Sequence, residues 1–233
     1  MTTPIEIPVY QMPDAKGVAV AGAGWLAERL VDCVQEAGET VLAISGGRSP
    51  WPMFRRLVSA GGVPWSHIHI VQVDERVAPA GHPDRNWSKV DEVFGPMVPS
   101  KNLHPMPVEE SDLEIASDTY AQLLLNLTAG RGIGVCHLGL GEDGHTASLF
   151  PGDPALEATD RAVVCTSEIH GGYRRMTLTL PVISSAQHVM WQVQGHTKKD
   201  MLSRMRRGDQ DLPAGRVRRQ HAVIFADQEA LGS

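Results

Sequence analysis

Several features that mark whole classes of protein are scarce or absent in this sequence of 233 residues. Its three cysteines, Cys33, Cys136 and Cys165, form no C-x-x-C pair, which predicts reduced thiols rather than a disulfide framework. Its apolar runs are short and broken by glycine or charge, so none is long enough to span a bilayer. The opening MTTPIEIPVYQ has neither the basic region nor the apolar core of a signal peptide, and we therefore expect a cytoplasmic protein.

Positive charge is also in short supply. The net charge of −6 argues against a general nucleic-acid binder. One basic cluster, from Lys198 to Arg219, departs from this trend and is either a solvated helix face with its loop or a local anion site. The ten histidines show no H-E-x-x-H spacing and the chain has no G-x-S-x-G, so neither a metal site nor a serine nucleophile is predicted.

What the sequence does contain is an alternation of strand-like and helical segments. Short apolar runs predict strands at 40–45, 68–75, 133–140, 162–167, 188–195 and 222–227, and most are continuous enough for parallel strands buried on both faces. Helical periodicity occupies 21–38, 111–127 and 198–208. Ser111 and Glu114 are spaced as a capping box, and Gly208 ends the last helix. The alternation predicts an α/β fold with a mainly parallel sheet in a single domain, residues 1–233.

Ligands of such sheets bind at the carboxyl ends of the strands, and SGGRSP follows the first strand there. Gly46 and Gly47 let backbone N–H groups approach a ligand, Ser45 adds a hydroxyl, and a helix is expected to start near Pro50. A helix N-terminus of this kind suits a phosphate. A tight turn with a helix cap remains the alternative, and without the lysine of a P-loop, triphosphate hydrolysis is disfavoured.

Cations also follow the strands. In VDERVAP, Asp74, Glu75 and Arg76 form either a structural ion pair or a site in which Arg76, held by a neighbouring carboxylate, faces the cleft and binds an anion or an oxyanion. Lys198, in GHTKKDML, and Arg175, before MTLTLP, either reach a phosphate or are solvated surface residues.

The segment GLGEDGHTASLFPG contains a literal G-x-G-x-x-G at Gly139, Gly141 and Gly144. A dinucleotide site is disfavoured, because Asp143 would face the pyrophosphate and because the motif lies in the middle of the chain rather than opening a βαβ unit. No nicotinamide or flavin cofactor is therefore expected.

The same segment presents a histidine after a glycine turn. His145 would be exposed to the cleft, where an imidazole suits general-base chemistry near neutral pH. Asp143 could orient its ring, and the small residues 146–148 are expected to open a helix. A capping or merely exposed histidine is the alternative.

Five segments in this order and spacing, SGGRSP, VDERVAP…DRNW, GLGEDGHTASLFPG, RRMTLTLPVI and GHTKKDML, resemble the 6-phosphogluconolactonase family over residues 45–202. The resemblance implies a Rossmann-like fold, its sheet flanked by helices on both faces. It also implies hydrolysis of 6-phospho-D-glucono-1,5-lactone in the oxidative pentose phosphate pathway. It further implies a small-molecule substrate and no cofactor, metal, nucleic-acid or membrane partner.

The resemblance further implies roles for individual residues. His145 would be the general base, Arg76 would stabilise the oxyanion or hold the substrate, and Asp143 would orient His145. The 6-phosphate would bind to residues on three segments: Ser45, Gly46, Gly47, Arg175 and Lys198.

Glucosamine-6-phosphate deaminases share this fold but carry D-E-Y where this chain has Asp74, Glu75 and Arg76, and I-A-F-N-E-P-G where it has TASLFPG. A deaminase or isomerase of aminosugar phosphates is therefore the second hypothesis, and a catalytically silent sugar-phosphate binder is the third. Two segments depart from the lactonase pattern. Residues 171–173, Gly-Gly-Tyr, stand where the family often has proline, and DRNW replaces a commoner S-N.

Overall fold

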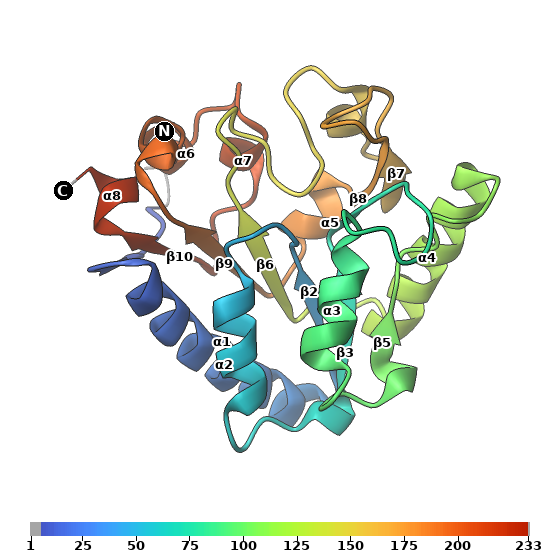
Figure 1. Ribbon diagram of the computed structural model, residues 1–233, viewed down its shortest axis with the longest axis horizontal. Coiled ribbons are helices and arrows are strands. Elements are labelled where there is room, and N and C mark those ends of the chain that lie inside the picture. Colours follow the sequence, from blue (N-terminus) through green and yellow to red (C-terminus); the bar gives the residue numbers. More distant parts are fainter. Residues whose placement is uncertain (1–5, 233) are drawn as a thin grey trace.

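Seven strands form a parallel sheet in the computed structural model, which describes residues 6–232 (Figure 1). Across the sheet they are β1 (Val9–Met12), β10 (Ala222–Asp227), β9 (His188–Val193), β6 (Val135–Gly139), β2 (Thr40–Ile44), β3 (Ile68–Gln72) and β5 (Leu103–His104). Every neighbouring pair is parallel. The predicted α/β fold with a mainly parallel sheet is confirmed, although the short strands β1 and β5 were not predicted.

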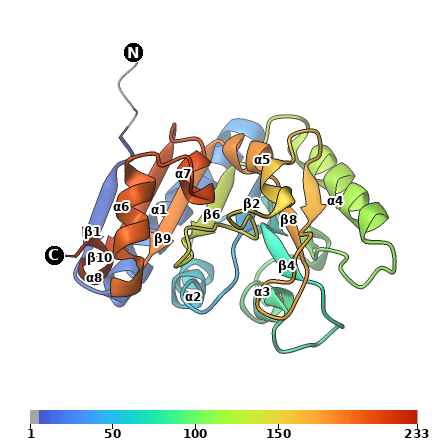
Figure 2. The same cartoon turned by 90° about the horizontal axis from the view of Figure 1, so that it is seen from above.

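Helices cover both faces of this sheet. One apolar cluster contains α1 (Ala15–Ala37), α2 (Trp51–Ser59) and α3 (Asn86–Phe94), and the other contains α4 (Leu113–Thr128), α5 (Leu180–Ser184), α6 (Lys199–Arg206), α7 (Pro213–Arg216) and α8 (Gln228–Leu231). Figure 2 shows α2 and α3 on one side of the strands and α5 and α7 on the other. Successive residues of a strand point to opposite faces, so Leu42 and Ile44 pack in the first cluster while Val41 and Ala43 pack in the second.

A second, three-stranded sheet is antiparallel and contains β4 (Asp74–Arg76), β8 (Arg175–Leu178) and β7 (Val163–Cys165). The predicted strand 68–75 is thus divided between the two sheets. The run at 162–167, predicted as a strand of the same kind as the others, pairs in the antiparallel sheet instead. Arg76 lies directly opposite Arg175 in this second sheet.

Helix ends follow from local side chains. The predicted capping box at Ser111 is wrong, because the N-cap of α4 is Asp112, whose carboxylate accepts hydrogen bonds from the N–H groups of Glu114 and Ile115 at 2.9 and 3.1 Å. A carboxylate at the N-cap satisfies two of the free N–H groups of the first turn. The chain leaves α6 through Gly208, with φ 73°, as predicted. No helix within residues 6–232 is long and apolar enough to cross a membrane.

Candidate active site

The candidate site is a cleft of about 600 Å³ beyond the carboxyl ends of β2, β6 and β9. β2 and β6 are neighbours, but the strands of this sheet that come next along the chain lie on opposite sides of them, β3 beside β2 and β9 beside β6. This change of direction leaves a crevice in which parallel α/β sheets bind ligands. The structure brings all of the predicted site residues to the cleft: Ser45, Gly46, Gly47, Arg76, Asp143, His145, Arg175 and Lys198.

The loop after β2 is built so that its backbone faces the cleft. The buried Ser45 hydroxyl donates to the carbonyl of His137 at 3.0 Å, which ties the loop to β6. A Cβ on Gly46 would lie 2.0 Å from the side-chain oxygen of Asn86, so any larger residue there would displace Asn86. Gly47 has φ 97°, in the left-handed region that glycine adopts without strain. The helix predicted near Pro50 begins at the next residue as α2.

A buried polar pair supports this loop from below. Gln192 donates from its amide to the carbonyl of Ser49 at 3.1 Å, and its Oε1 lies 3.0 Å from Nε2 of His137. Because that oxygen accepts, His137 carries its proton on Nε2. Burial lowers the pKa of His137 to about 4, so the imidazole is neutral near pH 7.

His145 lies at the end of the glycine turn that follows β6. Its Nδ1 is 2.5 Å from Oδ1 of Asp143, and its backbone N–H donates to the same oxygen at 3.1 Å. The hydrogen bond to His145 holds the pKa of Asp143 down, at about 2. A Cβ on Gly141 would lie 2.1 Å from Nδ1 of His145, so this glycine makes room for the pair. Because the carboxylate accepts, the Nδ1 proton faces Asp143 and the Nε2 lone pair is left free.

The residues that follow His145 form a turn, so the predicted helix at 146–148 is wrong. The N–H of Leu149 donates to the carbonyl of Thr146 at 2.9 Å, and Ala147 has φ 50°. The Thr146 hydroxyl donates to the carbonyl of Gly139 at 3.0 Å and ties the turn to β6. This bond takes the chain away from a helical path.

Aromatic rings support the His145 imidazole. The centroid of Phe150 lies 4.5 Å from that of His145, and the ring of His170 stacks on Phe150 at 3.7 Å. His170 is fixed in turn by Asp153, whose Oδ2 lies 3.0 Å from its Nε2. The candidate base therefore rests on an apolar ring and is about one third exposed, with 32% of its side-chain surface accessible.

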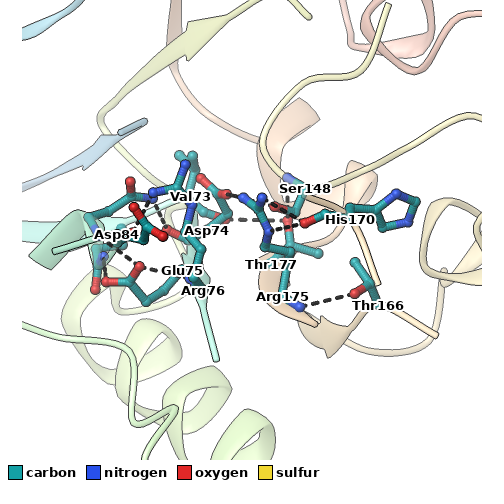
Figure 3. Close-up of polar contacts among 12 residues, drawn as sticks. Val73, Asp74, Glu75, Arg76, Asp84, Ser148, Thr166, His170, Arg175 and Thr177 are labelled. Carbon is teal, nitrogen blue, oxygen red and sulfur yellow. Dashed lines mark hydrogen bonds and ion pairs between the residues drawn. The ribbon is translucent and has the colours of Figure 1, made fainter. Parts of the chain in front are cut away.

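A buried carboxylate lies on the floor of the cleft beside an arginine (Figure 3). Asp74 accepts a hydrogen bond from the Ser148 hydroxyl at 2.6 Å, and burial raises its pKa. Nη1 of Arg175 is 4.0 Å from Asp74 Oδ2, and Nη2 donates to the carbonyl of His170 at 2.9 Å. Burial lowers the pKa of Arg175.

Glu75 is fully buried and ties β4 to α3. Its carboxylate accepts from the backbone N–H groups of Arg76, Asn86 and Trp87, each at 2.8 Å. Its ion pair is with Arg85, whose Nε is 3.2 Å away. The structural ion pair considered for the Asp-Glu-Arg triplet thus forms, but with Arg85 from farther along the same segment instead of Arg76.

Arg76 itself has no ion-pair partner within the described part of the chain. Its Nη1 donates to the backbone carbonyl of Asp84 at 2.5 Å (Figure 3). The predicted neighbouring carboxylate is therefore wrong, because a carbonyl oxygen holds the guanidinium. A carbonyl fixes the group without neutralising its charge, so the charge of Arg76 is left for a ligand.

Lys198 is the member of the basic cluster that lines the cleft. It lies at the end of a short 3₁₀ helix, His196–Lys198, with its Nζ 3.8 Å from Glu142. Farther along, Arg204 pairs with Asp209 and Arg216 with Glu157, each at 2.6 Å. Half of the eight cations of the cluster therefore form ion pairs. Among residues 6–232 no three histidine, cysteine or carboxylate side chains are grouped to hold a metal ion.

Comparison with known proteins places the chain in a family. The family model described as glucosamine-6-phosphate isomerases/6-phosphogluconolactonase matches residues 13–226. The chain belongs to the glucosamine-6-phosphate isomerase/6-phosphogluconolactonase family.

Individual relatives agree with this membership. A 6-phosphogluconolactonase of Synechocystis sp. is 34% identical over 218 residues, which cover 87% of this chain and 88% of that protein. The crystal structure of a 6-phosphogluconolactonase from Thermotoga maritima has a TM-score of 0.85 and 25% identity, and the match covers 95% of this chain and 99% of that one. A monomeric glucosamine-6-phosphate deaminase is similar in fold alone, with a TM-score of 0.83 and 17% identity.

The sequence analysis did not predict several residues of the cleft. Arg48, Asn86 and Gln192 also line it. Asn86 packs against Gly46 in the loop after β2, and its side-chain amide donates to the carbonyl of Asp74 at 3.1 Å. Arg48 and Asn86 lie in SGGRSP and DRNW, two segments that the sequence analysis had already connected with the site. Gln192 lies inside an apolar strand, where nothing in the local pattern marks it.

Proposed function

We propose that this protein hydrolyses 6-phospho-D-glucono-1,5-lactone to 6-phosphogluconate, with His145 as the general base. The observation that carries the proposal is the His145–Asp143 pair, which shares one cleft with the unpaired charge of Arg76. The similarity to 6-phosphogluconolactonases along almost the whole chain supports the choice of substrate.

The tautomer of His145 suits the first step. Nδ1 donates to Asp143, so the lone pair of Nε2 takes a proton from water as the water oxygen bonds to the lactone carbonyl carbon. The carbonyl electrons move to its oxygen, and Arg76 stabilises that oxyanion. Asp143, with its pKa at about 2, stays ionised and offsets the charge of the imidazolium.

Collapse of the tetrahedral intermediate completes the reaction. The oxyanion electrons return to the carbon, the bond to the ring oxygen breaks, and Nε2 gives its proton to that oxygen. The product is an open-chain acid, which then loses its carboxyl proton to solvent. This mechanism uses no metal and no cofactor.

Residues on three elements hold the 6-phosphate in this proposal. The backbone N–H groups of Gly46 and Gly47 lie just before the start of α2, where the helix dipole favours an anion. Lys198 and Arg175 supply positive charge from other segments that line the same cleft. We further propose that residues 1–233 act as a single domain in the cytoplasm on this small-molecule substrate.

A coupled assay tests the proposal. Glucose-6-phosphate dehydrogenase generates the lactone, and 6-phosphogluconate dehydrogenase reports the product. His145→Ala is expected to lower kcat by ~10²–10⁴-fold, the usual contribution of a positioned base. His67→Ala, at an exposed histidine outside the cleft, is the matched control and is expected to keep full activity.

The outcomes separate function from mechanism. A folded wild-type protein that does not accelerate lactone hydrolysis would refute the lactonase proposal. Ammonia release from glucosamine 6-phosphate would then identify a deaminase, and sugar-phosphate binding without turnover would identify a silent binder. Full activity in His145→Ala would keep the function and refute the base.

A further inference from the structure

The two segments that depart from the family pattern, 171–173 and DRNW, meet beside the cleft. The hydroxyl of Tyr173 donates to Oδ2 of Asp84 at 2.8 Å, although the two residues are 89 positions apart in the chain. The tyrosine ring also packs edge to face against His82, with centroids 5.6 Å apart. We call this Tyr173–Asp84–His82 contact the latch.

The latch acts on residues 77–85, the segment that joins Arg76 to α3. At one end the N–H of Val77 donates to the carbonyl of Arg174 at 3.0 Å. At the other end Arg85 is buried, with its Nε 3.2 Å from Glu75. Asp84 itself is exposed, and within the segment its N–H donates to Nδ1 of His82 at 3.2 Å. The bond from Tyr173 therefore fixes Asp84 from outside the segment.

The position of Asp84 matters because Arg76 depends on it. Within residues 6–232 the Arg76 guanidinium donates through Nη1 to the Asp84 carbonyl, and Nε of Arg76 is buried there without a hydrogen-bond partner. Arg175, the arginine opposite it in the sheet, is held more firmly, because its Nε and Nη2 both donate to the carbonyl of His170. A shift of the Asp84 backbone thus moves or frees Arg76, whereas Arg175 has its own anchor.

We propose that Tyr173 is a positioning residue for catalysis, which holds Arg76 in place through Asp84. The proposal rests on the proposed function, because it gives Arg76 the task of stabilising an oxyanion. Since an oxyanion exists only after the attack on the carbonyl, loss of the latch lowers kcat more than it raises KM.

Tyr173→Phe removes a single oxygen atom and keeps the ring against His82. We expect kcat to fall about tenfold, since a shift near 1 Å costs up to ~10²-fold and a loosened guanidinium still reaches the site part of the time. Asp84→Ala should have the same effect, while Asp84→Asn, which keeps an acceptor for the tyrosine, should retain most of the activity. Tyr10→Phe is the matched control, because Tyr10 is exposed and stacks on Phe225 away from the cleft.

A double-mutant cycle shows whether the effect passes through Arg76. In an Arg76→Ala background, Tyr173→Phe should cause no further loss of kcat, because the group that it positions is gone. An undiminished tenfold loss in that background would contradict the proposal and assign Tyr173 another role. So would wild-type kcat in a folded Tyr173→Phe variant.

A second readout needs no turnover. Phenylglyoxal modifies accessible guanidinium groups, and peptide mass spectrometry follows each arginine separately. Arg76 should react several times faster in Tyr173→Phe than in wild type, while Arg161, paired with Glu114 and Asp118, serves as the unchanged reference. An inactive wild-type protein would refute the proposed function alone, whereas an equal rate at Arg76 in both proteins would refute the latch.

Discussion

Gly141→Ala should disable the candidate base without unfolding the protein. The φ angle of Gly141 is not positive, so alanine fits the backbone, but its Cβ would lie 2.1 Å from Nδ1 of His145 and 2.6 Å from Oδ1 of Asp143. A Cβ atom essentially never lies closer than 3.0 Å to such an atom, so Nδ1 must move away by about 0.9 Å. The hydrogen bond that sets the tautomer and direction of the imidazole then breaks or turns.

A displacement of about 1 Å at a reacting group costs up to ~10²-fold in rate. We therefore expect kcat to fall by about this factor in the coupled assay. KM should stay within about twofold, because the residues proposed to hold the phosphate lie on other segments. The free energy of unfolding in urea should change by less than about 1 kcal/mol, since both displaced side chains are partly exposed and can rotate into solvent.

Gly61→Ala is the matched control, because its Cβ would meet nothing within 4 Å and its φ is not positive. It should leave kcat and stability unchanged. Combining Gly141→Ala with His145→Ala should be no worse than His145→Ala alone, because the glycine acts through the histidine. A kcat within threefold of wild type in a folded Gly141→Ala protein would refute the reasoning, since the close His145–Asp143 pair would then not matter for the reaction.

Two further predictions concern stability. Histidine in the unfolded chain takes up a proton near pH 6.5, but buried His137 does so only near pH 4. Lowering the pH from 7 to 5 should therefore reduce the free energy of unfolding by about 2 kcal/mol through this group. In urea titrations His137→Asn should remove that part of the wild-type decrease in stability, and an unchanged decrease would contradict the burial argument. Gly46→Ala should lower the free energy of unfolding by about 1–3 kcal/mol, because the new Cβ would overlap Asn86. This destabilisation should be smaller in an Asn86→Ala background. An equal destabilisation there would show that the clash is not with Asn86.

The fold class could be predicted because it depends on local repetition. Buried parallel strands are apolar along their whole length, and helices repeat their apolar residues every three to four positions, so β2, β6, β9, β10, α1 and α4 are visible in the sequence. β5 has two residues, and the four residues of β8 begin with Arg175, the second of two consecutive arginines, so neither strand carries such a signal. The capping error at Ser111 is a shift of one residue, to a neighbour that is an equally good N-cap.

The sequence by itself also placed most of the candidate site residues after strands, since parallel strands bring their carboxyl ends to one edge. Arg175 is the exception, because it begins the antiparallel strand β8. Only the tertiary structure decided how those residues are held. It pairs Glu75 with Arg85, gives Arg76 a carbonyl instead of a carboxylate, and sets Tyr173 on Asp84. The first two contacts depend on the path of the loop that returns from β4 to α3, and the third depends on how that loop lies against the one that carries Tyr173. The Asp143–His145 contact, by contrast, joins residues two positions apart in a single turn, so the local sequence could predict it.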